Sequence, residues 1–251
     1  MISVDLNADI GESFGNYSTG NDSMIMDFIS SANIACGFHA GDPVVIAQTV
    51  RMAVIKGVAI GAHPGYPDLQ GFGRRSMALS ASEVYDYVLY QVGALKSIAE
   101  SEGGKLSHVK AHGALYNDAV RNRELAEAII GASKALDSSL VIYGLPNSEI
   151  ENATLRNGMR FALEAFADRA YYKDGTLVPR KLKDSVISDI TEVSDRVEGM
   201  VLSNRIKTYD GGLLIIRPDT VCLHGDNMHA VEIAREINTR LSANGIEIKS
   251  L

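Results

Sequence analysis

Polar and apolar residues alternate in several short segments of the chain, and most of these segments become polar toward their C-terminal ends. In the first, residues 2–8, Asp5 and Asn7 alternate with Val4 and Leu6. Such alternation places successive side chains on opposite faces of a β-strand, so one face carries chemistry and the other packs. Comparable segments predict strands at about 2–8, 32–36, 58–61, 140–143, 160–164 and 220–223, and in the stretch that starts at His108. A short final run at 246–249 is either an eighth strand or a terminal brace.

Helix signals lie between these strands. Asp42 followed by Pro43 predicts an N-cap with proline at the first helical position, and Ser80 with Glu83 predicts a capping box. Gly57 is expected to end the helix that Asp42 begins. The expected helices cover about 22–31, 43–56, 81–101, 122–136, 147–157, 184–203 and 227–244, and 208–218 is expected to form a small extended excursion.

The alternation of strand and helix favours a parallel α/β fold, and the absence of a linker or a break in composition favours a single domain over 1–251. In an open sheet, only the strands near a switch point need polar ends. Here such ends recur along the whole chain, which suits a closed ring. We therefore expect a distorted (β/α) barrel of about seven parallel strands, with the polar strand ends converging on one site.

Composition narrows the class of protein. The chain has 251 residues, of which 46% are hydrophobic and 22% charged, as in ordinary globular proteins. A net charge of -7, no Lys/Arg block and no tryptophan argue against nucleic-acid binding. Neither a leader pattern nor an apolar run long enough for a bilayer is visible, so we expect a cytoplasmic protein without a membrane partner.

The two cysteines do not indicate a disulfide framework. Cys36 and Cys222 lie far apart and form no CxxC pair, which argues against a structural zinc site or a set of disulfides. Both are expected to be small buried residues in a reducing compartment. A nucleophilic Cys36 is the alternative.

Four histidines share one context, since each ends an extended segment and is followed within two residues by glycine or by Pro-Gly. One such histidine is usually a structural hydrogen-bonding residue, but four indicate that at least two act on a ligand. Glycine allows the close backbone approach that a small-ligand pocket requires. These histidines are His39, His63, His112 and His224.

Charged residues extend this set. Asp9 and Glu12 follow the first strand, near the rim, where a general base or a metal would lie. Lys110 is expected inside the barrel, either in an internal ion pair or as a cation for a substrate carboxylate or an oxyanion. Arg74, beside Gly-Phe-Gly, is the best placed arginine for an anion; Arg75 and Arg169 are weaker candidates.

The sequence alone does not decide whether the chain binds a metal or a nucleotide. Asp and His at strand ends are the ligands of metal-dependent hydrolases on this architecture, but no HExxH or similar motif is present. The sequence also lacks a GxxxxGK[ST] loop and a GxGxxG turn after a strand. A nucleotide would therefore be bound unconventionally or by another chain.

Seven segments together resemble the LamB/YcsF family over essentially the full length of the chain. The resemblance implies a seven-stranded barrel related to the glycoside hydrolase/deacetylase superfamily. It also implies ATP-dependent opening of 5-oxo-L-proline to L-glutamate, in a complex with 5-oxoprolinase subunits B and C. ATP would be a co-substrate, bound here or by a partner, while a divalent metal and a homo-oligomer are left open. The segments are 5–15, 32–43, 61–68, 71–75, 109–116, 164–171 and 222–226.

On this interpretation, Lys110 and Arg74 hold a carboxylate or a phosphate. Asp9 or one of three histidines activates water, and His224 or Asp226 protonates the leaving nitrogen. The expected catalytic residues are Asp9, His39, His63, Lys110, His112, His224 and Asp226. The expected substrate-binding residues are Asn7, Glu12, Asn33, Arg74, Tyr116, Glu164 and Asp168. Two alternatives are a stand-alone, metal-dependent, deacetylase-like hydrolase and a non-catalytic component that binds substrate or organises the complex.

Overall fold

Parallel strands close into a barrel in the computed structural model, which describes residues 2–224 and 229–251. Within these residues, seven strands follow one another around the ring, and the last pairs with the first from Asp5↔Thr220 to Asp9↔His224. The predicted distorted (β/α) barrel is therefore confirmed. The ring strands are β1 (Ser3–Ile10), β2 (Ser31–Ala35), β3 (Ala59–His63), β4 (Leu106–Val109), β5 (Val141–Gly144), β6 (Arg160–Phe166) and β9 (Thr220–His224).

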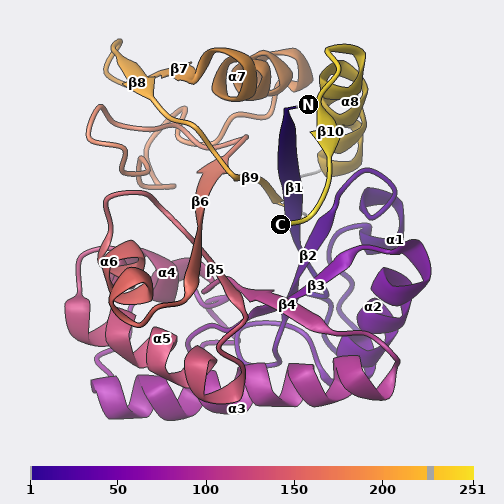
Figure 1. The fold of residues 1–251 in the computed structure, drawn as a ribbon, viewed down its shortest axis with the longest axis vertical. Helices are drawn as coiled ribbons and strands as arrows, with labels where there is room; N and C mark the ends of the chain where they lie inside the picture. Colours follow the sequence, from indigo (N-terminus) through magenta and orange to yellow (C-terminus); the bar gives the residue numbers. More distant parts are fainter. Residues whose placement is uncertain (1, 225–228) are drawn as a thin grey trace.

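The main helices lie outside this ring, and a short antiparallel hairpin and a terminal strand complete the described elements (Figure 1). The terminal strand pairs with the start of β1. The helices are α1 (Asp22–Ile25), α2 (Pro43–Lys56), α3 (Ala81–Ser101), α4 (Gly113–Ala119), α5 (Arg123–Leu136), α6 (Glu149–Arg156), α7 (Ile190–Ser203) and α8 (Ala230–Ala243). The hairpin is β7 (Arg205–Lys207) with β8 (Leu213–Ile215), and the terminal strand is β10 (Glu247–Ile248). None of the helices in the described residues has the length and apolarity needed to cross a bilayer.

Local sequence signals explain several helix ends. The Asp42 side chain accepts hydrogen bonds from the backbone N–H groups of Val44 and Val45, both at 2.9 Å, and Pro43 starts α2. Ser80 and Glu83 form the predicted capping box at α3. Gly57 ends α2 at φ +69°, in the left-handed region that glycine enters without strain.

Three predicted boundaries were wrong. The helix expected at 184–203 starts only at Ile190, because the Asp189 carboxylate caps it by accepting from the Glu192 N–H. The helix expected at 22–31 ends at Ile25, since the Ser30 hydroxyl is held against β1 by Asp5. The extended stretch from His108 leaves the sheet after Val109, and α4 then starts at Gly113.

The polar face of the alternating pattern points into the barrel. Asp5 lies deepest and is fully buried, and its carboxylate accepts hydrogen bonds from four hydroxyl groups, including those of Thr220 and Tyr143. Burial raises the pKa of Asp5. This network fills the barrel beneath the carboxyl ends of the strands, so the space for a ligand lies at those ends.

Candidate functional site

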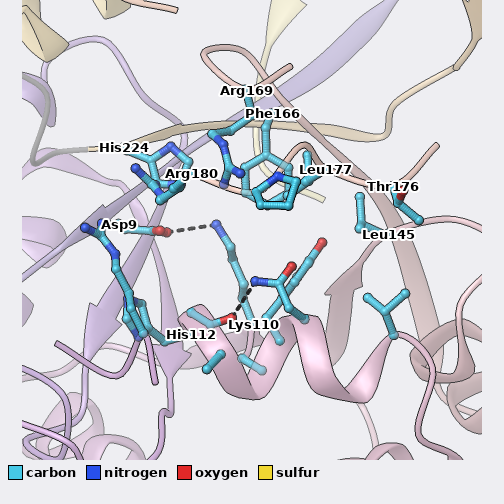
Figure 2. A pocket seen from close by; sticks show the side chains of 18 of the residues that line it. Asp9, Lys110, His112, Leu145, Phe166, Arg169, Thr176, Leu177, Arg180 and His224 are labelled. Carbon is cyan, nitrogen blue, oxygen red and sulfur yellow. Dashed lines mark hydrogen bonds and ion pairs between the residues drawn. The ribbon is translucent and has the colours of Figure 1, made fainter. Parts of the chain in front are cut away.

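A cavity of about 650 Å³ opens at the carboxyl ends of the strands. This volume suits a small-molecule ligand. Asp9, His63 and Lys110 line its base, and α4 contributes Tyr116. Figure 2 shows Arg169, Arg180 and His224 on the side of the cavity away from His112. The described lining carries four arginines, Arg74, Arg121, Arg169 and Arg180.

Lys110 is the central cation of the cavity floor. Its Nζ lies 2.8 Å from Asp9 Oδ1, 2.9 Å from Glu164 Oε1 and 2.8 Å from Cys222 Sγ. Burial alone would lower the pKa of Lys110, but Asp9 and Glu164 outweigh this effect and raise it well above the usual value. The side chain is therefore an ammonium ion that neutralises carboxylates from β1 and β6.

Asp9 joins this cation to a histidine. Although burial acts to raise the pKa of Asp9, His63 and Lys110 hold it well below its usual range. His63 Nε2 lies 3.3 Å from Asp9 Oδ2, and His63 Nδ1 lies 2.7 Å from the carbonyl oxygen of Lys110. Because a carbonyl only accepts, Nδ1 carries the hydrogen and Nε2 faces the carboxylate. Asp9 and His63 thus form a pair that can move a proton at the cavity floor.

Two further histidines stack beside this pair. The rings of His39 and His112 are 3.8 Å apart and nearly parallel, at 6°. Burial lowers the pKa of both rings well below the usual value, and the neighbouring His63 lowers them further. The backbone at Gly65 and Gly73 lies close against the stack. A Cβ at Gly65 would lie 2.7 Å from His39 Nδ1, and one at Gly73 would lie 2.7 Å from His112 Nδ1, so neither position has room for a side chain. Both imidazoles are therefore neutral near pH 7.

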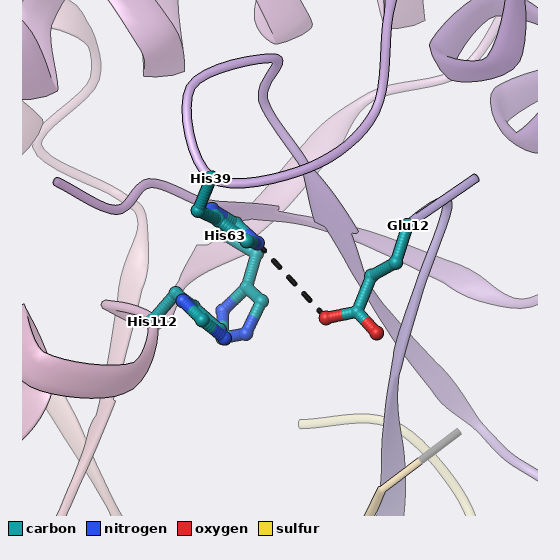
Figure 3. Close-up of side chains that lie close together, drawn as sticks. All are labelled: Glu12, His39, His63 and His112. Carbon is teal, nitrogen blue, oxygen red and sulfur yellow. Dashed lines mark ion pairs between the residues drawn. The ribbon is translucent and has the colours of Figure 1, made fainter. Parts of the chain in front are cut away.

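Two groups of buried residues have a composition and spacing that could bind a metal. In the first, Glu12, His39, His63 and His112 each offer one ligand atom, all within 4.8 Å of one another (Figure 3). In the second, the ligand atoms of Asp9, Cys222 and His224 meet the same limit.

His224 belongs to a second acid–base pair. Its Nδ1 donates to Asp168 Oδ1 at 2.7 Å, and its ring stacks on Phe166 with centroids 5.5 Å apart. The carboxylate fixes the tautomer and the ring orientation, so Nε2 is left for other partners. His224 lines the cavity while Asp168 is buried behind it.

Tyr116 adds a neutral hydroxyl to the wall. Burial raises the pKa of Tyr116 well above its usual value, and the nearby Glu164 raises it further. The phenol therefore keeps its proton and can donate it to Glu164 or to a ligand.

The structure gathers most of the predicted site residues around one cavity. Three others, His39, Glu164 and Asp168, are buried directly behind the lining and contact it. Asp226 lies outside the described residues. Those that line the cavity are Asp9, Glu12, His63, Arg74, Lys110, His112, Tyr116 and His224.

Asn7 and Asn33 lie lower, beneath the cavity lining. Asn33 Nδ2 donates to Asn7 Oδ1 at 2.6 Å and to Asp9 Oδ1 at 2.8 Å, and Asn7 Nδ2 donates to Thr220 Oγ1. Both amides are fully buried. From this position the two amides help to hold Asp9 in place. The sequence had predicted that they contact the substrate directly.

Most of the loop that lines the cavity after β6 was not predicted from the sequence to be part of the site. Thr176, Leu177 and Arg180 come from the irregular segment after β6, and no periodic pattern marks them. Arg169 was undervalued: its guanidinium donates to the carbonyl oxygen of Val178 at 2.7 Å and so ties this loop down. Burial lowers the pKa of Arg169 to about 10, which leaves it charged near pH 7. The polar composition of the loop was the only available signal.

The cysteines match the plainer interpretation. Burial raises the pKa of Cys36 to about 12, and burial together with Asp9 raises that of Cys222 well above its usual value. Because the thiolate is the nucleophile, neither residue is activated for attack.

Comparisons with known proteins agree with this architecture. The model of the LamB/YcsF family matches residues 4–251. A protein of Bacillus mycoides (strain KBAB4), named as the A subunit of 5-oxoprolinase, is 51% identical over 249 residues, which are 99% of this chain and 98% of that protein. The crystal structure of a lactam utilization protein from Thermus thermophilus superposes with a TM-score of 0.95 at 48% identity, with both chains fully covered. A peptidoglycan deacetylase from Bacillus subtilis shares the fold alone, at a TM-score of 0.50 and 13% identity over all of this chain and 88% of that one.

Proposed function

The chain belongs to the LamB/YcsF family, and we propose that it is the A subunit of a 5-oxoprolinase, a hydrolase that opens 5-oxo-L-proline to L-glutamate. One observation carries the proposal. A small-ligand cavity contains two acid–base pairs, Asp9–His63 and His224–Asp168, in a chain about half identical along its length to proteins named as the A subunit of 5-oxoprolinase.

The charges of the cavity suit this substrate. 5-Oxo-L-proline carries a carboxylate beside a cyclic amide, and Arg74 and Arg180 would bind the carboxylate or a phosphate at the rim. Lys110 would offset the negative charge that develops on the amide oxygen while it keeps Asp9 ionised. Phe166 and Leu145 would pack against the apolar carbons of the ring.

The two acid–base pairs of the cavity would each carry out one proton transfer. Asp9 with His63 would take a proton from the attacking water, and His224, oriented by Asp168, would give one to the leaving nitrogen. The amide C–N bond then breaks, and the ring opens to a carboxylate and an ammonium group. Each such proton transfer contributes about 10²- to 10⁴-fold in rate.

We assign ATP binding to a partner. The sequence lacks the GxxxxGK[ST] and GxGxxG loops. An unactivated lactam resists water, so ATP would transfer its terminal phosphoryl group to the amide oxygen, and ADP would leave. After water attacks and the C–N bond breaks, a second water would release inorganic phosphate from the phosphorylated carboxyl group. The arginine rim would bind the phosphorylated intermediate. The partners proposed are subunits B and C. The cytoplasmic location and a homo-oligomer stay predictions.

Reconstitution tests this function. The purified chain is mixed with its proposed partners, ATP and 5-oxo-L-proline, and glutamate and ADP are measured, with each component omitted in turn. We expect glutamate only in the complete mixture. Full activity of the partners alone would assign a non-catalytic role to this chain. Turnover by this chain alone without ATP would identify a stand-alone hydrolase.

A further inference from the structure

A cluster of three histidines and one glutamate lies at the edge of the cavity, outside the ion pairs of Lys110. Its members come from four separate segments: Glu12 follows β1, His39 follows β2, His63 ends β3 and His112 precedes α4. Between 0% and 7% of each residue is exposed. Figure 3 shows the Glu12 carboxylate directed toward the imidazoles, with Oε1 4.0 Å from His39 Nε2.

Several ring nitrogens in this cluster have no hydrogen-bond partner among the described residues. They are both nitrogens of His39, His112 Nδ1 and His63 Nε2. A buried polar atom without a partner is costly, so most such atoms in folded proteins are bonded to protein, water or a ligand. Unpaired nitrogens on three neighbouring rings indicate a shared ligand.

The orientation of His63 shows which of its nitrogens is available to a ligand. Its Nδ1–H donates to the carbonyl oxygen of Lys110, so Nε2 is the ring nitrogen that faces the cluster, 3.3 Å from Asp9 Oδ2. A backbone carbonyl that accepts from the remote ring nitrogen is also the usual arrangement around a metal-bound histidine.

The stack limits how many rings can bind at once. A metal lies close to the plane of each imidazole that binds it, and the nearly parallel rings of His39 and His112 cannot both meet that condition for one ion. His63 stands almost perpendicular to both, at 90° and 84°. We propose that Glu12, His63 and one ring of the His39–His112 stack bind a divalent transition-metal ion.

The donor set favours zinc or a similar ion. Two imidazoles and one carboxylate suit zinc, iron or manganese, and three protein ligands leave a position open toward the cavity. Such an ion polarises a carbonyl or lowers the pKa of bound water. Any part in lactam opening rests on the proposed function, whereas the binding of the ion does not.

The neighbouring group of Asp9, Cys222 and His224 is a poorer candidate. The Lys110 ammonium lies 2.8 Å from both Asp9 Oδ1 and Cys222 Sγ, so a cation of the chain already fills that position. A second positive charge there would be repelled. The histidine cluster therefore accounts better for one ion.

Metal binding is tested on the full chain without its partners. The protein is stripped with a chelator, titrated with Zn²⁺ or Co²⁺, and analysed for metal content and for the visible absorption bands of Co²⁺. The test variants are His63→Gln and Glu12→Gln. The matched control is His229→Gln, which changes an exposed histidine outside the cluster. Thermal unfolding with and without Zn²⁺ verifies that each variant folds and reports binding independently.

We expect about one ion per chain in the wild type and in His229→Gln, with affinity lower by more than about 100-fold in both test variants. The wild type should also unfold at a higher temperature with Zn²⁺. The proposal is overturned if the wild type binds no ion, or if Glu12→Gln and any folded His63→Gln protein bind it like the control. Oxoprolinase activity of the reconstituted complex is measured separately, so failure of the metal site and failure of the proposed function give different results.

Discussion

Lys110 Nζ lies 2.8 Å from Asp9 Oδ1, although the two residues are 101 positions apart in the sequence. Both residues are buried, and Glu164 adds a second carboxylate to the same ammonium. The pair places opposite charges at the floor of the cavity and links β1 to the end of β4. Its loss should therefore affect stability as well as chemistry.

Lys110→Met should lower the free energy of unfolding by about 3–5 kcal/mol, because it leaves buried carboxylates without their cation. Lys56→Met is the control, since Lys56 pairs with Asp27 at the surface and such pairs contribute about 0–1 kcal/mol. Urea denaturation of both variants measures the difference. Equal losses would show that Lys110 is not a stabilising partner of the cluster.

Acid should destabilise the metal-free protein through its buried histidines. The pKa values of His39 and His112 are well below normal and that of His108 is about 3, whereas each is about 6.5 in the unfolded chain. Between pH 6.5 and these folded values, the unfolded chain binds more protons, so stability falls as the pH falls. From pH 7 to 5.5, we expect a loss of about 1 kcal/mol per histidine. Urea midpoints with a chelator present measure it, and an unchanged midpoint would contradict the assigned protonation states.

Asp168→Asn should impair the second acid–base pair. The amide cannot hold the imidazolium form of His224, so kcat of the reconstituted complex should fall by about 10²- to 10⁴-fold while KM changes less. Asp27→Asn, at an exposed ion pair outside the cavity lining, serves as the control. Steady-state kinetics across pH gives the readout. An unchanged kcat and pH profile would remove His224 from the proton transfer.

Gly61→Ala should strongly destabilise the barrel. A Cβ at Gly61 would collide with the imidazole of His108, which is held by Asn33 Oδ1 at 2.8 Å. Overpacking of this kind costs about 1–3 kcal/mol or more. Gly93→Ala is the matched control, because its Cβ would meet only Leu136 at 3.6 Å and alanine favours the helix interior. Thermal unfolding compares them, and a Gly61→Ala protein as stable as Gly93→Ala would refute this packing.

Much of the fold could be predicted from local patterns. Alternation around Asp5 and Asn7 gave the inward polar face, and the Asp42 and Ser80 caps gave the starts of two long helices. Boundaries failed where a tertiary contact decided them, as when Ser30 is held by Asp5. No local pattern encodes such a contact between distant segments.

The site was most predictable where residues lie at or just after the ends of strands. His63 and His224 end strands, so a closed ring brings them to one mouth. Arg180 comes from an irregular loop whose path depends on the hydrogen bond from Arg169 to Val178, and the sequence carries no periodicity there. The polar character of Asn33 was visible, but its depth below the cavity depends on strand register.

The central claim is that ring opening takes place in the cavity of this chain, and Asp9→Asn in the reconstituted complex tests it most directly. The amide has a similar size but cannot accept a proton from water, so assembly should persist while glutamate formation falls by about 10²- to 10⁴-fold. His112→Ala provides a second substitution in the same cavity, and Asp27→Asn provides the control. A folded, assembled Asp9→Asn complex that forms glutamate at the wild-type rate would contradict the account.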